Sequence, residues 1–269
     1  MQLRQEPVNA IGWAQVLEPP SLLTWPAREV QPLSGWTLRF NDGLSHRANS
    51  VATLDFNGPD VAAAIEAAER AYVARGLPPM FQVTSAAKPE NLDGVLTARG
   101  YVGVTPSLVC VADAEIVRTR CAQVGEAQII AQPNAGFDAL VVSGSHSPAD
   151  GRERLEILSR IAVPQVRMTV IEQETAVACG MGAMALGHVG INLMRTAPLW
   201  RRRGYAKHVL RAIAQWSLQQ GTRTLFLSVE KANAAACALY AHAGFTPAYA
   251  YRYYKKIRTA ANHPETGTC

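Results

Sequence analysis

Residues 194–206 read MRTAPLWRRRGYA, and they pass from a strand-like segment through a turn into the start of a helical pattern. The turn contains a proline and three consecutive arginines, and Gly204 stands directly before the helix. A strand that runs into a glycine-containing loop and a helix amino terminus presents unpaired backbone N–H groups and the positive end of a helix dipole. Such a loop suits a pyrophosphate, to which the arginines add charge-assisted contacts.

The loop differs from two common nucleotide-binding motifs. It matches neither the G-x-x-x-x-G-K-[ST] pattern of nucleoside triphosphate sites nor the G-x-G-x-x-G pattern of dinucleotide sites. Gly204 lets the backbone approach a ligand closely, and Ala206 keeps the first helical turn thin. The sequence therefore favours a pyrophosphate ligand of another class.

Strand and helix patterns alternate on both sides of this loop. Before it, we predict strands at residues 166–172, 175–184 and 188–196 and a helix at residues 148–160. After it, the apolar spacing predicts a helix from residue 206 to Gly221, a strand at 224–229, a helix at 233–243 and a strand at 246–254. This order predicts an α/β fold.

Two segments together resemble the GNAT superfamily of acyl-CoA-dependent N-acetyltransferases. Residues 194–206 are similar to that family's strand, turn and R/Q-x-x-G-x-G/A loop, and residues 229–245, VEKANAAACALYAHAGF, to its strand, Asn, helix and L-Y-x-x-x-G-F segment. The resemblance covers about residues 165–255. It implies transfer of an acetyl group from acetyl-CoA to an amine of a small molecule or peptide.

The resemblance also implies roles for individual residues. The strand would pair with the pantetheine arm and polarise the thioester carbonyl, the loop would hold the pyrophosphate, and Tyr240 would give a proton to the departing thiolate. Cys237 lies within a helix without a His or Asp partner at a suggestive spacing, so direct transfer is preferred to an acyl-cysteine route. The implied acetyl-CoA-binding residues are Met194, Arg195, Thr196, Arg201, Arg202, Arg203, Gly204, Tyr205, Ala206 and Asn233.

The general base is less well defined. An amine with a pKa of about 10 must lose a proton before it attacks a thioester. Family members often carry a glutamate where this chain has Gly190. The remaining candidates are Glu230, Glu172, Glu174 and His188. We take Glu230, together with Tyr240, as the predicted catalytic residues.

Residues 35–111 resemble a second, degenerate acetyltransferase-like repeat. We predict two strands around the turn Asp42-Gly43, a helix at 60–75, a strand at 80–84, a helix at 89–99 and a strand at 103–111. No R-x-x-G-x-G/A loop precedes the helix at residue 60. We therefore predict two halves in tandem: residues 1–120 with a structural or substrate-shaping role, residues 121–258 with the acetyl-CoA site, and a flexible tail at 259–269.

Three polar residues in this first half, Arg39, Arg47 and Asn49, fall beside Ser50 in a segment with buried alternate positions. They have two interpretations, which the sequence does not separate. They line a substrate cleft between the halves, or they form a hydrogen-bond cluster that joins the halves.

The composition excludes several classes of protein. The 269 residues are 48% hydrophobic and 17% charged, as in globular proteins, and no apolar run reaches the roughly 18 residues that a membrane helix needs. The amino terminus lacks the features of a secretory signal, which predicts a cytoplasmic protein. Five cysteines without a C-x-x-C pair and histidines without H-E-x-x-H give no support for a metal.

Two rival functions come from the same residues. Gly190 favours an acyl-CoA-binding regulatory module without catalysis, and the net charge of +5 with tyrosines and cations at residues 251–256 favours a nucleic-acid-binding protein. A cationic edge strand explains the second pattern more simply. We predict an amine acceptor as the partner, with no nucleic acid and no membrane, and a monomer or homodimer.

Overall fold

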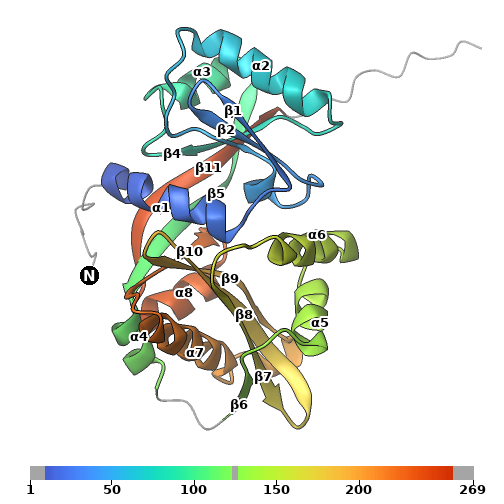
Figure 1. Cartoon of the computed structure of the whole chain (residues 1–269), viewed down its shortest axis with the longest axis vertical. Coiled ribbons are helices and arrows are strands. Elements are labelled where there is room, and N and C mark those ends of the chain that lie inside the picture. Colours follow the sequence, from blue (N-terminus) through green and yellow to red (C-terminus); the bar gives the residue numbers. More distant parts are fainter. Residues whose placement is uncertain (1–9, 123–126, 257–269) are drawn as a thin grey trace, which may run out of the picture.

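The computed structural model describes residues 10–122 and 127–256, in which eleven strands form one long sheet with helices on both faces (Figure 1). The strand order is β1-β2-β3-β4-β11-β5-β10-β9-β8-β7-β6. This arrangement confirms the predicted α/β fold. No helix within these two ranges is both long enough and apolar enough to cross a membrane.

The predicted elements of the second half are found close to their expected bounds. The strands are β1 (Glu29–Leu33), β2 (Trp36–Phe40), β3 (Val51–Ala52), β4 (Met80–Thr84), β5 (Tyr101–Asp113), β6 (Gln128–Ile130), β7 (Gln165–Glu172), β8 (Thr175–Ala185), β9 (His188–Thr196), β10 (Thr224–Glu230) and β11 (Thr246–Lys256). The helices are α1 (Ala10–Thr24), α2 (Val61–Val73), α3 (Leu92–Ala98), α4 (Ala114–Arg120), α5 (Ala135–Ser143), α6 (Pro148–Ser159), α7 (Tyr205–Gln219) and α8 (Ala234–Ala243), with short 3₁₀ turns η1 (His46–Ala48) and η2 (Pro198–Trp200).

The two predicted halves exchange their last strands. β5, from the first half, lies between β10 and β11, whereas β11, from the second half, lies between β4 and β5. All of these contacts are antiparallel. The sheet is therefore continuous across the predicted division near residue 120, which stays a prediction. The tail predicted at residues 259–269 lies outside the described residues.

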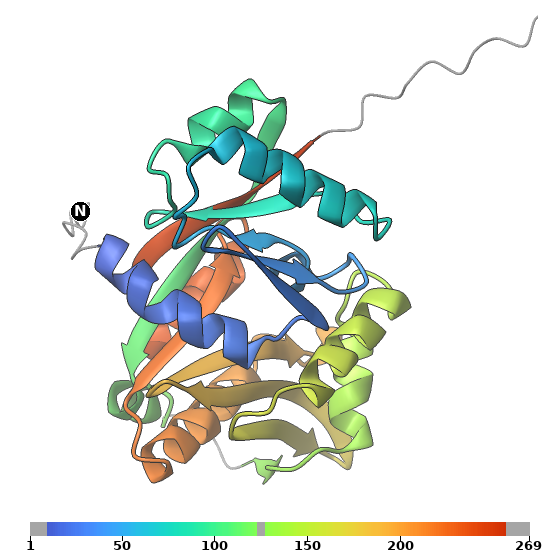
Figure 2. The same cartoon turned by 45° about the horizontal axis from the view of Figure 1, so that its top comes forward.

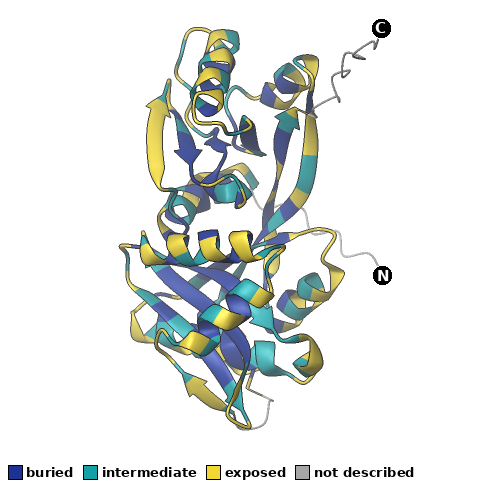
Figure 3. Cartoon of the chain, turned by 90° about the vertical axis from the view of Figure 1, so that its right-hand side faces the viewer, coloured by how far each residue is buried: buried dark blue, intermediate teal, exposed yellow. Residues whose placement is uncertain are grey.

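Side chains of β8 alternate between two cores, as the period of a strand requires. Cys179 and Met181 are buried against α5 and α6 on one face. On the other face, a Cβ at Gly180 would come 2.7 Å from Val209 of α7 and one at Gly182 would come 2.9 Å from Ile213, so both glycines let α7 lie close to the sheet. In Figure 3 these central strands are buried between the two helical layers.

β9 and β10 are paired only over part of their length. Their parallel pairing runs from His188–Thr224 to Ile191–Leu227 and ends there, although both strands continue. Leu193 has a φ of 55°, and the β8–β9 register shifts near the same level. The edge of β9 from Asn192 to Thr196 that faces β10 therefore has no strand partner among the described residues.

Helix α1 is an element that the sequence analysis did not predict. Pro19 and Pro20 lie inside it, and such a pair ordinarily argues against a helix. Ala14 and Leu17 are fully buried, and the helix packs on β11, β8 and β9 (Figure 2). Tertiary packing thus outweighs the local preference of the two prolines.

The predicted hairpin around Asp42-Gly43 is wrong. The hairpin is formed instead by β1 and β2, which turn at Ser34 and Gly35 with φ values of 48° and 85°. Residues 44–50, expected as a strand, form a loop and the 3₁₀ turn η1. The reason is a set of side-chain contacts: Asn49 Oδ1 accepts the N–H groups of Asn41 and Gly43 and folds the loop back on itself.

The carboxylate of Glu153, on α6, holds this loop against the second half. It is buried and accepts five N–H donors: the side-chain amides of Asn41 and Asn49 and the backbone N–H groups of Asp42, Leu44 and Ser45, at 2.5–3.0 Å. A buried charge is tolerated when hydrogen bonds satisfy it in this way. The contact places residues 45–47 beside the second half.

Replacing Glu153 with Gln should lower the free energy of unfolding by about 2–4 kcal/mol, because an amide NH₂ would then face N–H donors. Urea denaturation measures this. Glu156→Gln on the same helix is the control: its carboxylate is half exposed and pairs with Arg28, so we expect a change of about 0–1 kcal/mol. Equal stability of the two variants would contradict the structural role of Glu153.

Candidate functional site

The loop between η2 and α7 has the backbone of an anion site. Arg202 and Gly204 both have left-handed conformations, with φ values of 60° and 91°, and Gly204 is the N-cap of α7. Backbone that alternates between the two hands turns successive N–H groups into one concavity. Among the described residues, the N–H groups of residues 202–206 have no hydrogen-bond acceptor. Gly204 adopts its conformation without the strain that a Cβ would add.

A cavity of about 870 Å³, here called the loop cavity, lies beside this loop. Its walls come from the end of β9, the loop, the start of α7, α8 and α5. The lining residues are Leu140, Ser143, Gly144, Met194, Arg195, Thr196, Ala197, Pro198, Trp200, Arg201, Arg202, Gly204, Tyr205, Ala206, Lys207, Asn233, Ala235, Ala236 and Leu239. Its volume is in the range of sites that bind cofactors and other small molecules.

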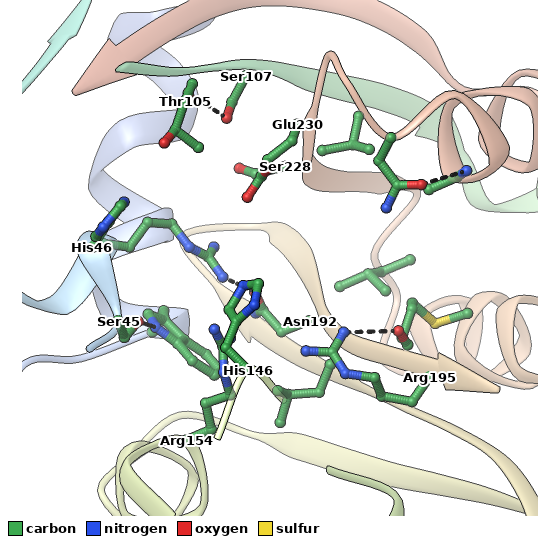
Figure 4. Close-up of a pocket in the computed structure, with 18 of the residues that line it drawn as sticks. Ser45, His46, Thr105, Ser107, His146, Arg154, Asn192, Arg195, Ser228 and Glu230 are labelled. Atoms are coloured by element: carbon green, nitrogen blue, oxygen red, sulfur yellow. Dashed lines mark hydrogen bonds between the residues drawn. The ribbon is translucent and has the colours of Figure 1, made fainter. Parts of the chain in front are cut away.

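A second cavity of about 520 Å³, here called the gap cavity, lies where β9 and β10 separate (Figure 4). It is lined by residues of both predicted halves: Trp25, Leu44, Ser45, His46, Arg47, Thr105, Ser107, Gly144, His146, Arg154, Ile191, Asn192, Leu193, Met194, Arg195, Ser228, Val229, Glu230, Asn233, Ala236, Tyr240, Tyr251 and Tyr253. The exchanged strands β5 and β11 thus bring first-half and second-half side chains to one site.

The two cavities share five lining residues, here called the neck: Gly144, Met194, Arg195, Asn233 and Ala236. Met194 and Arg195 belong to the unpaired edge of β9. A ligand bound along the loop cavity therefore ends next to a ligand bound in the gap cavity. This is the arrangement that a transfer between two molecules requires.

The predicted acetyl-CoA-binding residues lie together around the loop cavity, with one exception. Arg203 is not among the residues that line it; its guanidinium lies over the Trp200 ring, 5.0 Å from the centroid. Asn233 lines both cavities and is also the N-cap of α8, because its Oδ1 accepts the N–H of Ala236 at 3.1 Å. The predicted catalytic residues Tyr240 and Glu230 both line the gap cavity.

Tyr240 is buried on α8, where its ring meets that of Phe245 edge to face. Burial raises the pKa of its hydroxyl to about 12, and nearby Arg195 partly offsets the shift. A phenol with this pKa stays protonated at neutral and mildly basic pH. Tyr240 can therefore act as a proton donor but not as a base under these conditions.

Of the four candidate bases, Glu230 lines the gap cavity and the other three lie elsewhere. Glu172 belongs to a separate surface hollow beside α7, Glu174 is in the exposed β7–β8 turn, and His188 Nδ1 lies 2.7 Å from the carbonyl of Leu186. Glu230 is exposed at the end of β10. The geometry thus favours Glu230 among these candidates.

The structure gives a reason for the absence of a side chain at position 190. A Cβ on Gly190 would come 2.7 Å from the Thr24 hydroxyl and 2.9 Å from the Phe226 ring. Thr24 is the last residue of α1 and is fully buried. The amino-terminal helix therefore occupies the space that a glutamate at this position would need.

Several residues of the gap cavity escaped the sequence analysis. His46, His146 and Arg154 come from η1, from the α5–α6 connection and from α6, and no motif links these segments. Burial, followed by the charge of Lys255, lowers the pKa of His46. Arg154 donates from Nε to Asp150 at 2.8 Å. No sequence signal that we know of would have joined these three positions.

The polar group Arg39, Arg47 and Asn49 is divided by the structure. Arg47 lines the gap cavity and donates to Asn192 Oδ1 at 2.7 Å. Asn49 belongs to the Glu153 cluster that joins the halves, and Arg39 is buried within the first half, where it donates to Ser50. Both interpretations of this group hold, each for a different residue.

Comparison with known proteins agrees with this arrangement. Residues 15–254 match the family model described as "Probable histone acetyltransferase Rv0428c C-terminal". The protein named "Uncharacterized N-acetyltransferase YobR" from Bacillus subtilis (strain 168) is 27% identical over 236 residues, which cover 86% of this chain and 93% of that protein.

Two solved structures share the fold. The GCN5-related N-acetyltransferase from Kribbella flavida has a TM-score of 0.69 at 15% identity and covers 93% of this chain and 96% of its own. A tandem GNAT protein from the clavulanic acid biosynthesis pathway has a TM-score of 0.61 at 9% identity and covers 78% of this chain and 76% of its own. The chain belongs to this acetyltransferase family, within the GNAT superfamily of N-acetyltransferases.

Gly190→Ala should lower the free energy of unfolding by about 1–3 kcal/mol, because the new methyl group meets Thr24 and Phe226 in a packed core. Gly94→Ala is the control: Gly94 is in α3 with no atom within 4 Å of its Cβ position, and this change should stabilise the protein by about 0.5–1 kcal/mol. Thermal or urea unfolding compares them. A Gly190→Ala protein as stable as wild type would disprove the steric explanation.

Proposed function

We propose that this acetyltransferase binds acetyl-CoA in the loop cavity and passes the acetyl group directly to an amine held in the gap cavity. The acceptor is a small molecule or a peptide. The observation that carries the proposal is the neck, where Met194 and Arg195 at the unpaired edge of β9 line both cavities. A thioester laid along β9 would then end within reach of the acceptor.

Donor binding is assigned to backbone groups more than to side chains. The unpaired N–H groups of residues 202–206 would hold the pyrophosphate at the N-terminus of α7. The free edge of β9 at residues 194–196 would pair with the amides of pantetheine as an added strand. A backbone N–H from the same edge would polarise the thioester carbonyl, and Asn233 would contact the arm.

Proton transfers are assigned to the two acidic groups of the gap cavity. Glu230 would accept the proton of the attacking amine, directly or through a water molecule. Tyr240, which keeps its proton because burial raises its pKa to about 12, would donate to the departing thiolate. Formation of the amide bond and breakage of the thioester bond then leave a neutral thiol.

Direct transfer is favoured over an acyl-cysteine intermediate. Of the four cysteines within residues 10–122 and 127–256, none lines either cavity. Burial raises the pKa of the Cys110 thiol to about 11 and that of Cys179 to about 12, which suppresses the thiolate that a nucleophile needs. Cys237 Sγ lies 3.8 Å from the Glu230 carbonyl and has no basic partner in this contact.

A non-catalytic acyl-CoA-binding module is the weaker alternative. Its support was Gly190, and the packing of Thr24 against that residue explains the glycine without a loss of catalysis. Glu230 supplies a carboxylate in the acceptor cavity instead.

Gly204→Glu should abolish measurable acetyl-CoA binding, because a carboxylate would take the place of the pyrophosphate. A side chain at this positive φ also adds strain of about 1–2 kcal/mol. Gly187→Glu is the matched control, since Gly187 has a φ of 76° in open space away from the site. Calorimetric titration with acetyl-CoA and circular dichroism test both variants. Equal affinities of wild type and folded Gly204→Glu would remove the loop from the site.

Tyr240→Phe should reduce kcat about 100-fold, because it removes the donor to the thiolate, and should leave the acetyl-CoA Kd within about twofold. Cys237→Ala serves as its comparison on the same helix and should keep most activity. Steady-state kinetics and calorimetry separate the two effects. Unchanged turnover in Tyr240→Phe, or lost turnover in folded Cys237→Ala, would contradict the mechanism.

A further inference from the structure

The gap cavity carries far more positive than negative charge on its walls. Its charged and titratable lining residues are Arg47, Arg154, Arg195, His46, His146 and Glu230. The exposed acid in this set faces three arginines. An acceptor that is only a cation would meet repulsion over most of this surface.

Arg47 has no carboxylate partner within 4 Å among the described residues. It donates one hydrogen bond to the neutral amide oxygen of Asn192 at 2.7 Å, and its guanidinium lies over the Trp25 ring at 5.0 Å. The buried Glu18 carboxylate interacts with Arg47 at longer range, but Tyr249 and Gln82 hold it by hydrogen bonds of 2.7 and 3.0 Å. Arg47 is therefore positioned by neutral groups and keeps its charge for a ligand.

Arg154 is positioned by a single contact that leaves most of its donors available. Its Nε bonds to Asp150 Oδ1 at 2.8 Å, whereas its terminal nitrogens have no partner among the described residues. Asp150 Oδ2 accepts the backbone N–H of His146 at 3.1 Å and so also fixes the loop that carries this histidine. A guanidinium held at Nε can present its two terminal nitrogens to an anion as a fork.

Arg195, at the neck, adds a third donor. Its NH1 bonds to the Met194 carbonyl at 3.0 Å, and its Nε is buried without a partner in the part of the chain that the structure describes. Its side chain lies against Gly144, where a Cβ would come 2.6 Å from the Arg195 side chain. An unpartnered buried donor of this kind is costly unless a ligand satisfies it.

The negative and positive groups lie on opposite sides of the cavity. Figure 4 shows Glu230 and Ser228 on one side, with His146 and Arg154 on the other and Arg195 beside them. The acceptor amine must approach Glu230 if that residue is the base. The remainder of the acceptor then extends toward the arginines.

We propose that the acceptor is a small molecule that carries, besides its amine, a carboxylate or a phosphate, and that Arg47 and Arg154 bind this anionic group. The inference rests on the proposed function. Because guanidinium forks fit carboxylate and phosphate alike, both anions belong to the same chemistry. The cavity of about 520 Å³ holds a molecule of this size.

The test compares amines that differ in one anionic group. Acetyl transfer from acetyl-CoA is measured with β-alanine against β-alaninamide, with phosphoethanolamine against ethanolamine, and with spermidine and a lysine-rich peptide. At least one anionic amine should exceed its neutral counterpart about tenfold in kcat/KM, and the cationic acceptors should be poorest. The pair with the larger ratio distinguishes a carboxylate from a phosphate.

Variants assign the effect to the two arginines. Arg47→Gln and Arg154→Gln should each reduce the anionic-to-neutral ratio about tenfold, chiefly through KM, while the acetyl-CoA Kd stays within about twofold. Arg152→Gln is the control: Arg152 is exposed on α6, two residues from Arg154, and does not line the cavity. Its ratio should equal that of wild type.

The outcomes separate the two levels of the proposal. Faster transfer to neutral or cationic amines than to every anionic one overturns this inference and leaves the proposed function standing. An unchanged ratio in both arginine variants, with acetyl-CoA binding intact, also overturns it. If a variant fails to fold, the wild-type ratios decide. Transfer to no amine of the panel overturns the proposed function, and this inference with it.

Discussion

β9 and β10 separate after the pair Ile191–Leu227, and neither strand is free to close the gap. β10 is held on its other edge by β5, in a register that runs to Glu230–Ser107. β9 is held by β8 as far as Thr196. With both outer edges paired, the inner edges stay apart, and backbone groups that would bond to each other in a complete sheet are left for a ligand. The neck and the gap cavity both follow from this constraint.

The amino-terminal half completes the site rather than duplicating it. Its last strand, β5, supplies the pairing that holds β10 open, and β11 is held in turn between β4 and β5. The loop that Glu153 anchors places His46 and Arg47 at the gap. The end of α1 fills the space beside Gly190. A half without its own pyrophosphate loop therefore shapes the acceptor side.

The second half could be read from sequence because its signals are local. Gly204 before an amphipathic helix and Asn233 seven residues before Tyr240 are features of single segments, and the structure places them around one cavity pair. The acceptor side could not be read in this way. His46, His146 and Arg154 meet only because strands exchange between the halves, which depends on long-range pairing.

Two errors in the first half have the same physical origin. The pattern around Asp42-Gly43 is a good hairpin signal, but the amide of Asn49 and the carboxylate of Glu153, about a hundred residues away, supply stronger partners for its backbone. Pro19 and Pro20 hide α1 for a similar reason, since its buried face against the sheet stabilises a helix that propensity disfavours.

The central claim is that donor and acceptor occupy adjoining cavities at the same time. Initial-rate kinetics with acetyl-CoA and the best amine of the panel, both varied, test this claim most directly. A ternary complex predicts double-reciprocal lines that intersect. Parallel lines, the sign of a ping-pong route through an acetylated protein, would contradict it.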